Sequence, residues 1–279
     1  MTRTSTRVAF TLALTLVAAP GAFAQGSDDD SLLKPGEPDF SLVSVPTALR
    51  LPQLGSAIRI THRFAQNFNH TDFSDFASDL FGLDSGAVIG LEYRIGMAKN
   101  AQAGLHHSSD NRTWAFFGQL GLVRQNDASP LDLSALVSLD IPRVPKGTLF
   151  ERHVATGLAA ILSHAFGEHG AVYAEPTFVH NVFNEFGTAA DSDNAFFVGF
   201  GARVRVGQTL YLVVEAAPRV SGFKANTNHA AFAIEKRVGG HVFQLNASNS
   251  FGTTLSQLAM GGGPANNWHL GFNLSRKFF

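Results

Sequence analysis

Residues 267–279 alternate between apolar and polar side chains. One parity carries Trp268, Leu270, Phe272, Leu274 and Phe278 and is interrupted only by Arg276, while the other carries His269, Asn273, Ser275 and Lys277. A period of two is typical of a β-strand, and about 9–11 residues are enough for a strand to cross a membrane. The pattern predicts a membrane-crossing strand; the alternative is an edge strand of a soluble β-sandwich.

Similar alternation recurs from residue 56 onward and predicts twelve strands in all. In the first of them, Ile58 and Ile60 share one parity, and Arg59, Thr61 and Arg63 share the other. The predicted strands cover residues 56–64, 86–96, 101–108, 113–124, 131–140, 154–166, 171–181, 195–206, 209–220, 230–237, 241–248 and 267–279.

The connections between these segments alternate in length. Short turns are expected at 97–100, 125–130, 167–170, 207–208 and 238–240, and longer connections at 65–85, 141–153, 182–194, 221–229 and 249–266. Only residues 109–112 are short where a long loop is due. This arrangement is typical of outer-membrane barrels. We therefore predict an all-β fold, a transmembrane antiparallel up-and-down β-barrel of about twelve strands with short periplasmic turns and longer extracellular loops.

Composition supports a membrane environment. Only 15% of the residues are charged, against about 25% in an average soluble protein, and there are 25 phenylalanines. After the N-terminal region, no apolar stretch approaches the roughly 18 residues of a membrane-spanning helix. Strand pairing in a closed wall is then the way to satisfy the backbone in lipid. The chain has no cysteine, which excludes a lipid anchor and any disulfide.

The first 24 residues have the features of a Sec-type signal peptide, which predicts export to the outer membrane. Arg3 and Arg7 precede an apolar run over 8–19, and Ala22-Phe23-Ala24 supplies a cleavage site. Residues 25–55 are predicted to form a periplasmic N-terminal arm, and residues 56–279 the barrel. Within the arm, residues 39–54 either tuck inward or lead into the barrel. The mature chain has 19 basic against 22 acidic residues, which gives no reason to expect nucleic acid as a partner.

Residues 71–86 differ from the other connections because their apolar residues approximate a helical face. The face consists of Phe73, Phe76, Leu80 and Phe81, with Asp72 or Asp75 as the cap. We expect a loop helix packed on the barrel rim; a plug or gate folded into the mouth is the alternative.

The polar parity of the strands predicts a charged lumen. With the apolar parity facing lipid, the lumen collects Arg59, Arg63, Glu92, Arg94, Asp132, Asp140, Glu175, Arg203, Arg205, Glu215, Arg219, Glu235 and Arg237. These groups either brace the wall as buried ion pairs or form a narrow constriction that selects polar solutes. The residues predicted for the constriction are Arg59, Arg63, Glu92, Arg94, Glu175, Arg203, Arg205, Glu215 and Arg219.

The sequence gives weaker support for a metal site or an enzymatic activity than for a charged lumen. Eight histidines map to the predicted extracellular ends or loops, but His106 and His107 point to opposite faces of one strand and cannot chelate a metal together. No Gly-x-Ser-x-Gly motif or recognisable Ser/His/Asn signature is present, and the glycines at 261–263 fit a flexible loop better than a phosphate site. We predict no enzymatic activity, no metal and no cofactor.

Several stretches together resemble a known family. They are Thr61-His62-Arg63-Phe64, residues 81–87, residues 240–245, Asn249-Ser250 and residues 271–276. Their order and spacing are similar to those of an uncharacterised bacterial membrane-bound β-barrel domain family, and the terminal aromatic residue resembles the end of the closing strand of outer-membrane barrels. The resemblance implies a barrel in the outer membrane and brings no functional residues.

We predict an integral outer-membrane barrel that forms a narrow or gated pore for small polar solutes or ions. The alternative is a structural or partner-binding barrel without transport, with a barrel-borne hydrolase or a metal-binding rim less favoured. The expected partners are outer-membrane lipid and a periplasmic or envelope protein. The sequence indicates no oligomeric state.

Overall fold

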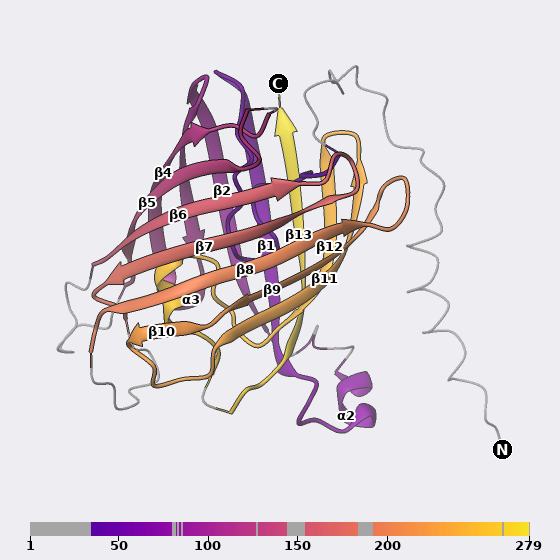
Figure 1. The fold of residues 1–279 in the computed structure, drawn as a ribbon. Helices are drawn as coiled ribbons and strands as arrows, with labels where there is room; N and C mark the ends of the chain where they lie inside the picture. Colours follow the sequence, from indigo (N-terminus) through magenta and orange to yellow (C-terminus); the bar gives the residue numbers. More distant parts are fainter. Residues whose placement is uncertain are drawn as a thin grey trace.

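The computed structural model describes residues 35–279 apart from 80, 81, 83, 85, 127, 144–153, 184–191, 264 and 279. The strands form one antiparallel wall (Figure 1). They are β1 (Ser56–Asn67), β2 (Ala87–Ala98), β3 (Ala101–Ser108), β4 (Thr113–Val123), β5 (Asp132–Ile141), β6 (Ala155–Ala165), β7 (Gly170–His180), β8 (Ala195–Arg205), β9 (Leu210–Ala217), β10 (Arg219–Gly222), β11 (His229–Val238), β12 (His241–Ser248) and β13 (His269–Phe278). The connections contain α2 (Phe73–Ser78), the 3₁₀ turn η3 (Asp110–Arg112) and α3 (Leu255–Met260).

The wall closes because β1 pairs with β13, which places Ser56 opposite Phe278 and Arg63 opposite Gly271. The strand predicted over 209–220 is split at Pro218, which has no N–H to donate to the ladder. Its two halves, β9 and β10, both pair with β8 and together make one strand of the barrel. The result is a closed antiparallel barrel of twelve strands, as predicted.

Side chains alternate across this wall as the sequence pattern predicted. Outward-facing residues are apolar and exposed, with Ile58 at 44% and Leu245 at 60% exposure, whereas Arg59, Thr61 and Arg63 are buried in the interior. Lipid is the environment that such an apolar outer face requires, and closure leaves no unpaired strand edge. No helix among the described residues is long and apolar enough to span a membrane.

The connections are sorted by length between the two ends of the barrel. The short-turn end carries the connections between β2 and β3 and between β11 and β12, together with the end of β13. The long-loop end carries α2, which lies opposite the C-terminus in Figure 1. The short connection at 109–112 is η3, where Asn111 and Arg112 adopt positive φ angles of 49° and 47°. A single 3₁₀ turn therefore connects β3 and β4 where a long loop was due.

The helix predicted within 71–86 is present as α2. Phe76 is buried and its ring lies 6.4 Å from that of Phe68, while Phe73 is 72% exposed. Leu80 and Phe81 of the predicted apolar face lie outside the described residues. This contact places α2 against the chain that leaves β1, and other segments fill the lumen.

Two of the segments that the structure describes occupy the interior. The first, which we call the N-terminal hairpin (residues 36–51), contains Leu42, Val43 and Val45, each with 0% exposure. The second is α3, of which all six residues are buried. Of the two alternatives for residues 39–54, inward tucking is the one present: residues 36–51 lie inside the barrel, where lumen-facing side chains hydrogen-bond their backbone. Residues 25–34 lie outside the described part of the chain.

Candidate functional site: the filled lumen

The N-terminal hairpin enters and leaves the lumen at the short-turn end. Gly36 packs against the β6–β7 turn so closely that a Cβ would lie 2.4 Å from the carbonyl oxygen of Gly167. The chain reverses in the lumen, where the N–H of Leu42 donates to the carbonyl of Val45 at 2.8 Å. The second arm then runs back to Leu54 at the end of β2. There the N–H of Leu54 donates to the carbonyl of Gly96 at 2.8 Å. Both arms of the hairpin thus connect to the same end of the barrel.

The tip of the hairpin is bound by one carboxylate of the wall. The backbone N–H groups of Val43, Ser44 and Val45 donate to the Glu215 carboxylate at 2.8, 2.9 and 3.0 Å. His229 completes the arrangement, with its Nε2 2.7 Å from Glu215 Oε1. Hydrogen bonds to an ionised acceptor are about twice as strong as neutral ones. Glu215 is therefore the main polar anchor of the tip.

Other lumen-facing side chains hold the hairpin backbone along its length. Their polar atoms contact main-chain groups that would otherwise be buried without partners. The contacts are Arg203 Nη2 to Ser41 O (2.8 Å), Gln244 Nε2 to Leu42 O (2.8 Å), Asn273 Nδ2 to Val43 O (3.0 Å), Gln119 Nε2 to Thr47 O (3.0 Å), Gln102 Nε2 to Leu49 O (3.1 Å), Arg59 Nη2 to Val43 O, and Lys277 Nζ to Pro38 O. Polar groups from six strands thus hold one short segment.

Arg50 connects the returning arm of the hairpin to β5. Its Nη2 lies 3.4 Å from Asp132 Oδ1 and 3.2 Å from the carbonyl oxygen of Leu133. Burial lowers the pKa of Arg50 below its ordinary value, and the nearby Asp132 opposes this shift. Arginine is not deprotonated in proteins at neutral pH, so Arg50 stays paired with Asp132.

The second segment, α3, enters from the long-loop end. The N–H of Ser256 donates to Asp140 Oδ2 at 3.0 Å, and the Ser256 hydroxyl contacts the same oxygen. Gln257 Nε2 donates to Asp110 Oδ2 at 3.0 Å. At the other end of the helix, Arg219 Nη1 donates to the carbonyl of Met260 at 2.7 Å. α3 is thus held at both ends by side chains of the wall and of η3.

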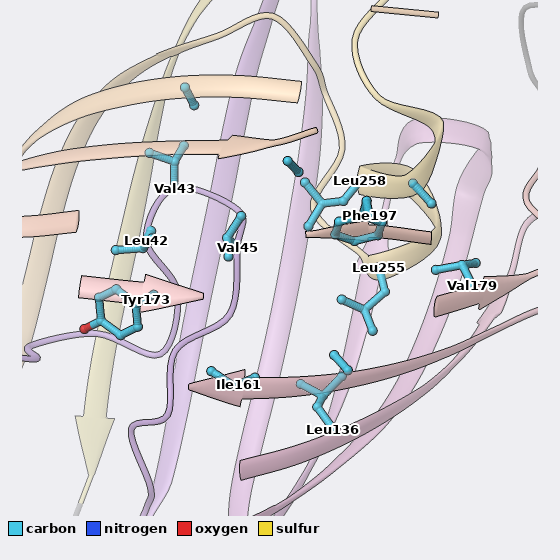
Figure 2. Packing of buried hydrophobic residues seen from close by; sticks show 14 of the residues in the cluster. Leu42, Val43, Val45, Leu136, Ile161, Tyr173, Val179, Phe197, Leu255 and Leu258 are labelled. Carbon is cyan, nitrogen blue, oxygen red and sulfur yellow. The ribbon is translucent and has the colours of Figure 1, made fainter. Parts of the chain in front are cut away.

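The two segments belong to one apolar cluster in the middle of the barrel. Figure 2 shows Leu42, Val43 and Val45 of the hairpin near Tyr173, and Leu255 and Leu258 of α3 near Phe197. The wall contributes apolar side chains to this cluster from β5, β6, β7, β8, β9 and β11. The polar side chains that hold the hairpin come mostly from the other strands. The lumen therefore has an apolar side and a polar side.

The structure buries eight of the nine residues predicted for a charged constriction. These eight are Arg59, Arg63, Glu92, Arg94, Glu175, Arg203, Glu215 and Arg219. Arg205 instead lies at the short-turn end, where Nη1 is 2.9 Å from Glu168 Oε2. The alternation of apolar and polar residues predicted that Arg205 faces the lumen. Arg205 is the last residue of β8, however, and its side chain reaches the turn at the end of the barrel.

The predicted bracing by ion pairs is present in part. Arg94 pairs with Glu92, and Arg203 pairs with Glu235 at 3.0 Å. Arg63 instead donates to Asn273 Oδ1 at 2.8 Å. Glu175 accepts from the hydroxyl of Thr177 at 3.2 Å. Most of the remaining charged groups contact the hairpin or α3 rather than one another.

The described histidines are spread over different faces of the wall. His106 faces the lumen, and His107 faces outward with its ring 4.3 Å from that of Trp114, as the sequence predicted. His62 stacks on Phe272 at 4.7 Å on the outer surface. In the part of the chain that the structure describes, no group of three or more His, Asp or Glu side chains has the arrangement of a metal site.

Sequence reasoning missed α3, although local signals for it exist. Thr254 precedes the helix and its hydroxyl accepts from the N–H of Gln257, while Gly261 follows the helix with φ of 83°. A Thr N-cap and a glycine after the last turn are typical helix boundaries. Leu255, Leu258 and Ala259 between them have the spacing of one apolar helical face.

These features define a membrane β-barrel whose lumen is filled by two segments of its own chain. The chain belongs to the family described as "Membrane bound beta barrel domain (DUF5777)", whose match covers residues 40–278 and so includes most of the N-terminal hairpin. No curated protein matches the sequence.

Among solved structures, the barrel is similar to several outer-membrane proteins at low identity. Outer membrane phospholipase A from Escherichia coli is 9% identical, with a TM-score of 0.45 over 80% of this chain and 90% of that one. OmpF of Salmonella typhi in complex with daunomycin is 5% identical, with a TM-score of 0.36 over 81% and 97%. The TodX monoaromatic hydrocarbon channel is 10% identical, with a TM-score of 0.37 over 82% and 90%. At these values the similarity carries no information about activity.

Proposed function

We propose that the protein is an outer-membrane barrel, exported by a Sec-type signal peptide, that works as a gated pore for small polar solutes or ions. The N-terminal hairpin and α3 close it at rest. The observation that carries this proposal is the attachment of the hairpin through hydrogen bonds from lumen-facing side chains to its backbone, with Glu215 at the tip.

The hydrogen bonds on the polar side of the lumen support the proposal that the hairpin can leave the lumen. Gln102, Gln119, Gln244 and Asn273 make hydrogen bonds that water replaces at a net cost of about 0.5–1.5 kcal/mol each. Since both arms of the hairpin connect to the short-turn end, it can withdraw on that side, which we infer to be the periplasmic one because short turns are typical of that side.

The apolar residues of the hairpin favour the closed state. Six of its large apolar side chains have at most 5% exposure, namely Phe40, Leu42, Val43, Val45, Leu49 and Leu51. Burying one such side chain contributes roughly 1.5–3 kcal/mol. Spontaneous opening is then rare, and we expect opening to need a trigger or a periplasmic or envelope protein that acts on the arm before residue 36.

Planar bilayer recording tests the proposal directly. We expect wild-type protein to show rare, brief openings and a variant that lacks residues 36–51 to show a steady conductance. Circular dichroism and heat-dependent gel mobility serve as controls that the shortened chain still forms a barrel. A folded variant without conductance above background would contradict the proposal.

A structural or partner-binding barrel without transport is the second candidate, because the apolar cluster of the lumen also stiffens the wall. Pull-down with a variant that lacks residues 25–34 distinguishes the two. A structural role predicts that bound envelope proteins are lost with this deletion, whereas a simple pore keeps its conductance.

Enzymatic activity is not part of the proposal. Thr253 Oγ1 lies 2.9 Å from His106 Nε2, and His106 Nδ1 lies 3.6 Å from Glu92. This order is that of a hydroxyl, a base and an orienting carboxylate. However, 3.6 Å exceeds a hydrogen bond, and Glu92 is already paired with Arg94. We expect purified protein to release no fatty acid from phospholipid vesicles.

A further inference from the structure

The turn between β3 and β4 holds an arginine in a strained backbone conformation. This connection, η3, is a single 3₁₀ turn at the end of the barrel where long loops are the rule. Within it, Asn111 and Arg112 have φ angles of 49° and 47°. Residues other than glycine rarely adopt positive φ, and strain of this kind is concentrated at functional positions. The turn thus keeps an arginine where a glycine would be less strained.

The turn places Arg112 beside a second arginine. The N–H of Arg143 donates to the carbonyl of Asn111 at 2.8 Å, so the chain that leaves β5 lies next to η3. In the register of β4 and β5, Trp114 is opposite Ile141. Two residues further along each strand, the same register sets Arg112 opposite Arg143. Both arginines are exposed, and the period of two places them on the outer face with Trp114.

The two arginines have no acidic partner among the described residues. Neither Arg112 nor Arg143 takes part in any of the ion pairs formed in that part of the chain. The neighbouring Asp110 accepts from Gln257 Nε2 at 3.0 Å and is therefore engaged with α3. Like charges directly opposite each other on adjacent strands are destabilising. An anion bound by both guanidinium groups would remove this repulsion.

The surface next to the arginines is aromatic and apolar. Trp114 and Phe116 of β4 are 45% and 49% exposed, and Ile141 and Leu139 lie opposite them on β5. Tryptophan is enriched where the membrane meets water, so Trp114 marks the level of the lipid headgroups. The arginines lie two residues beyond it, on the polar side of that level. An anion with attached acyl chains therefore suits this surface better than a free ion.

We propose that Arg112 and Arg143 bind a phosphate group of an outer-leaflet lipid, whose acyl chains lie along β4 and β5. Guanidinium groups bind phosphate through paired N–H donors, which makes arginine well suited to this contact. Long loops are typical of the extracellular side, so the ligand is the phosphorylated glucosamine lipid of the outer leaflet, lipid A. The inference goes beyond the proposed pore and needs no movement of the N-terminal hairpin.

Native mass spectrometry of the full-length protein in neutral detergent tests the site with three lipids. The probes are diphosphoryl lipid A, the same lipid with both phosphates removed, and phosphatidylglycerol. We expect diphosphoryl lipid A to bind about ten-fold more tightly than either of the others. Equal affinity for the two forms of lipid A would overturn the phosphate contact. Equal or tighter binding of phosphatidylglycerol would overturn the assignment to lipid A.

A double variant with a matched control locates the site. We expect Arg112→Gln combined with Arg143→Gln to bind the two forms of lipid A equally. Arg276→Gln is the control, because Arg276 is also exposed on the outer face but lies at the short-turn end, 4.9 Å from the ring centre of Phe278. Arg276→Gln should keep the preference for the phosphorylated form. An equal loss in both variants would mean that the lipid follows surface charge in general, and would overturn the site.

The strained turn gives a second test. Glycine adopts positive φ without strain, so we expect Arg112→Gly to raise the thermal midpoint of unfolding and to weaken lipid A binding several-fold. Asn111→Gly changes the other residue of positive φ and keeps both arginines, so it should leave binding unchanged. Unaltered binding in Arg112→Gly would overturn the proposal. A lower thermal midpoint would also overturn it, because Arg112 would then serve to hold the turn.

Discussion

Glu215 shows how one side chain can control a whole segment. Its carboxylate accepts from three consecutive backbone N–H groups of the hairpin tip and contacts His229. The strand pattern predicted that Glu215 faces the lumen, as it did for Arg59 and Arg203. It did not predict their partners, because those partners are backbone groups about 16 to 172 residues away.

The first prediction concerns this anchor. Glu215→Gln removes the charge and places an amide NH₂ against N–H donors, so we expect hairpin docking to weaken by about 2 kcal/mol. Open events in planar bilayers should then become roughly thirty-fold more frequent. Glu175→Gln is the control, since Glu175 is equally buried and its hydrogen bonds go to Thr177 rather than to the hairpin. Similar conductance in the two variants would contradict the role of Glu215.

At the scale of elements, the local pattern of apolar and polar residues predicts the strands but does not predict the two segments in the lumen. Each predicted strand is present within a few residues, because facing lipid on one side and the lumen on the other forces a period of two. The hairpin has Pro46 in its short strand pairing, and α3 is six residues long. Both are stabilised by contacts with distant strands, which local periodicity does not encode.

A core substitution tests whether α3 is held by packing. Leu258 has 0% exposure in the apolar cluster, and truncation of such a leucine costs about 2–5 kcal/mol. We expect Leu258→Ala to accelerate hydrogen exchange of the amides of α3 at least ten-fold, with the strands unchanged. Leu54→Ala, at a residue that is 80% exposed, is the control. Unaltered exchange in Leu258→Ala would mean that polar contacts alone fix α3.

At the scale of the molecule, lipid is the solvent for the outer face. An arginine at the bilayer midplane costs about 2–4 kcal/mol in a barrel, against about 0–1 near the interface. Leu245 in β12 and Met97 near the short-turn end of β2 are both 60% exposed. We expect Leu245→Arg to lower the free energy of unfolding in urea from vesicles by about 2–4 kcal/mol, and Met97→Arg by at most about 1 kcal/mol. Equal losses would indicate that no membrane surrounds this wall.

The central claim, that withdrawal of the N-terminal hairpin opens the barrel, has a direct test because the chain has no native cysteine. A Cβ at Gly199 would lie 3.2 Å from Val45 Cγ1, a separation that suits a disulfide between Val45→Cys and Gly199→Cys. The measurement is single-channel conductance of the Glu215→Gln variant with this cysteine pair, before and after reduction. We predict a closed channel when the pair is oxidised and frequent openings after reduction. Openings of the same size and frequency in both states would contradict the account.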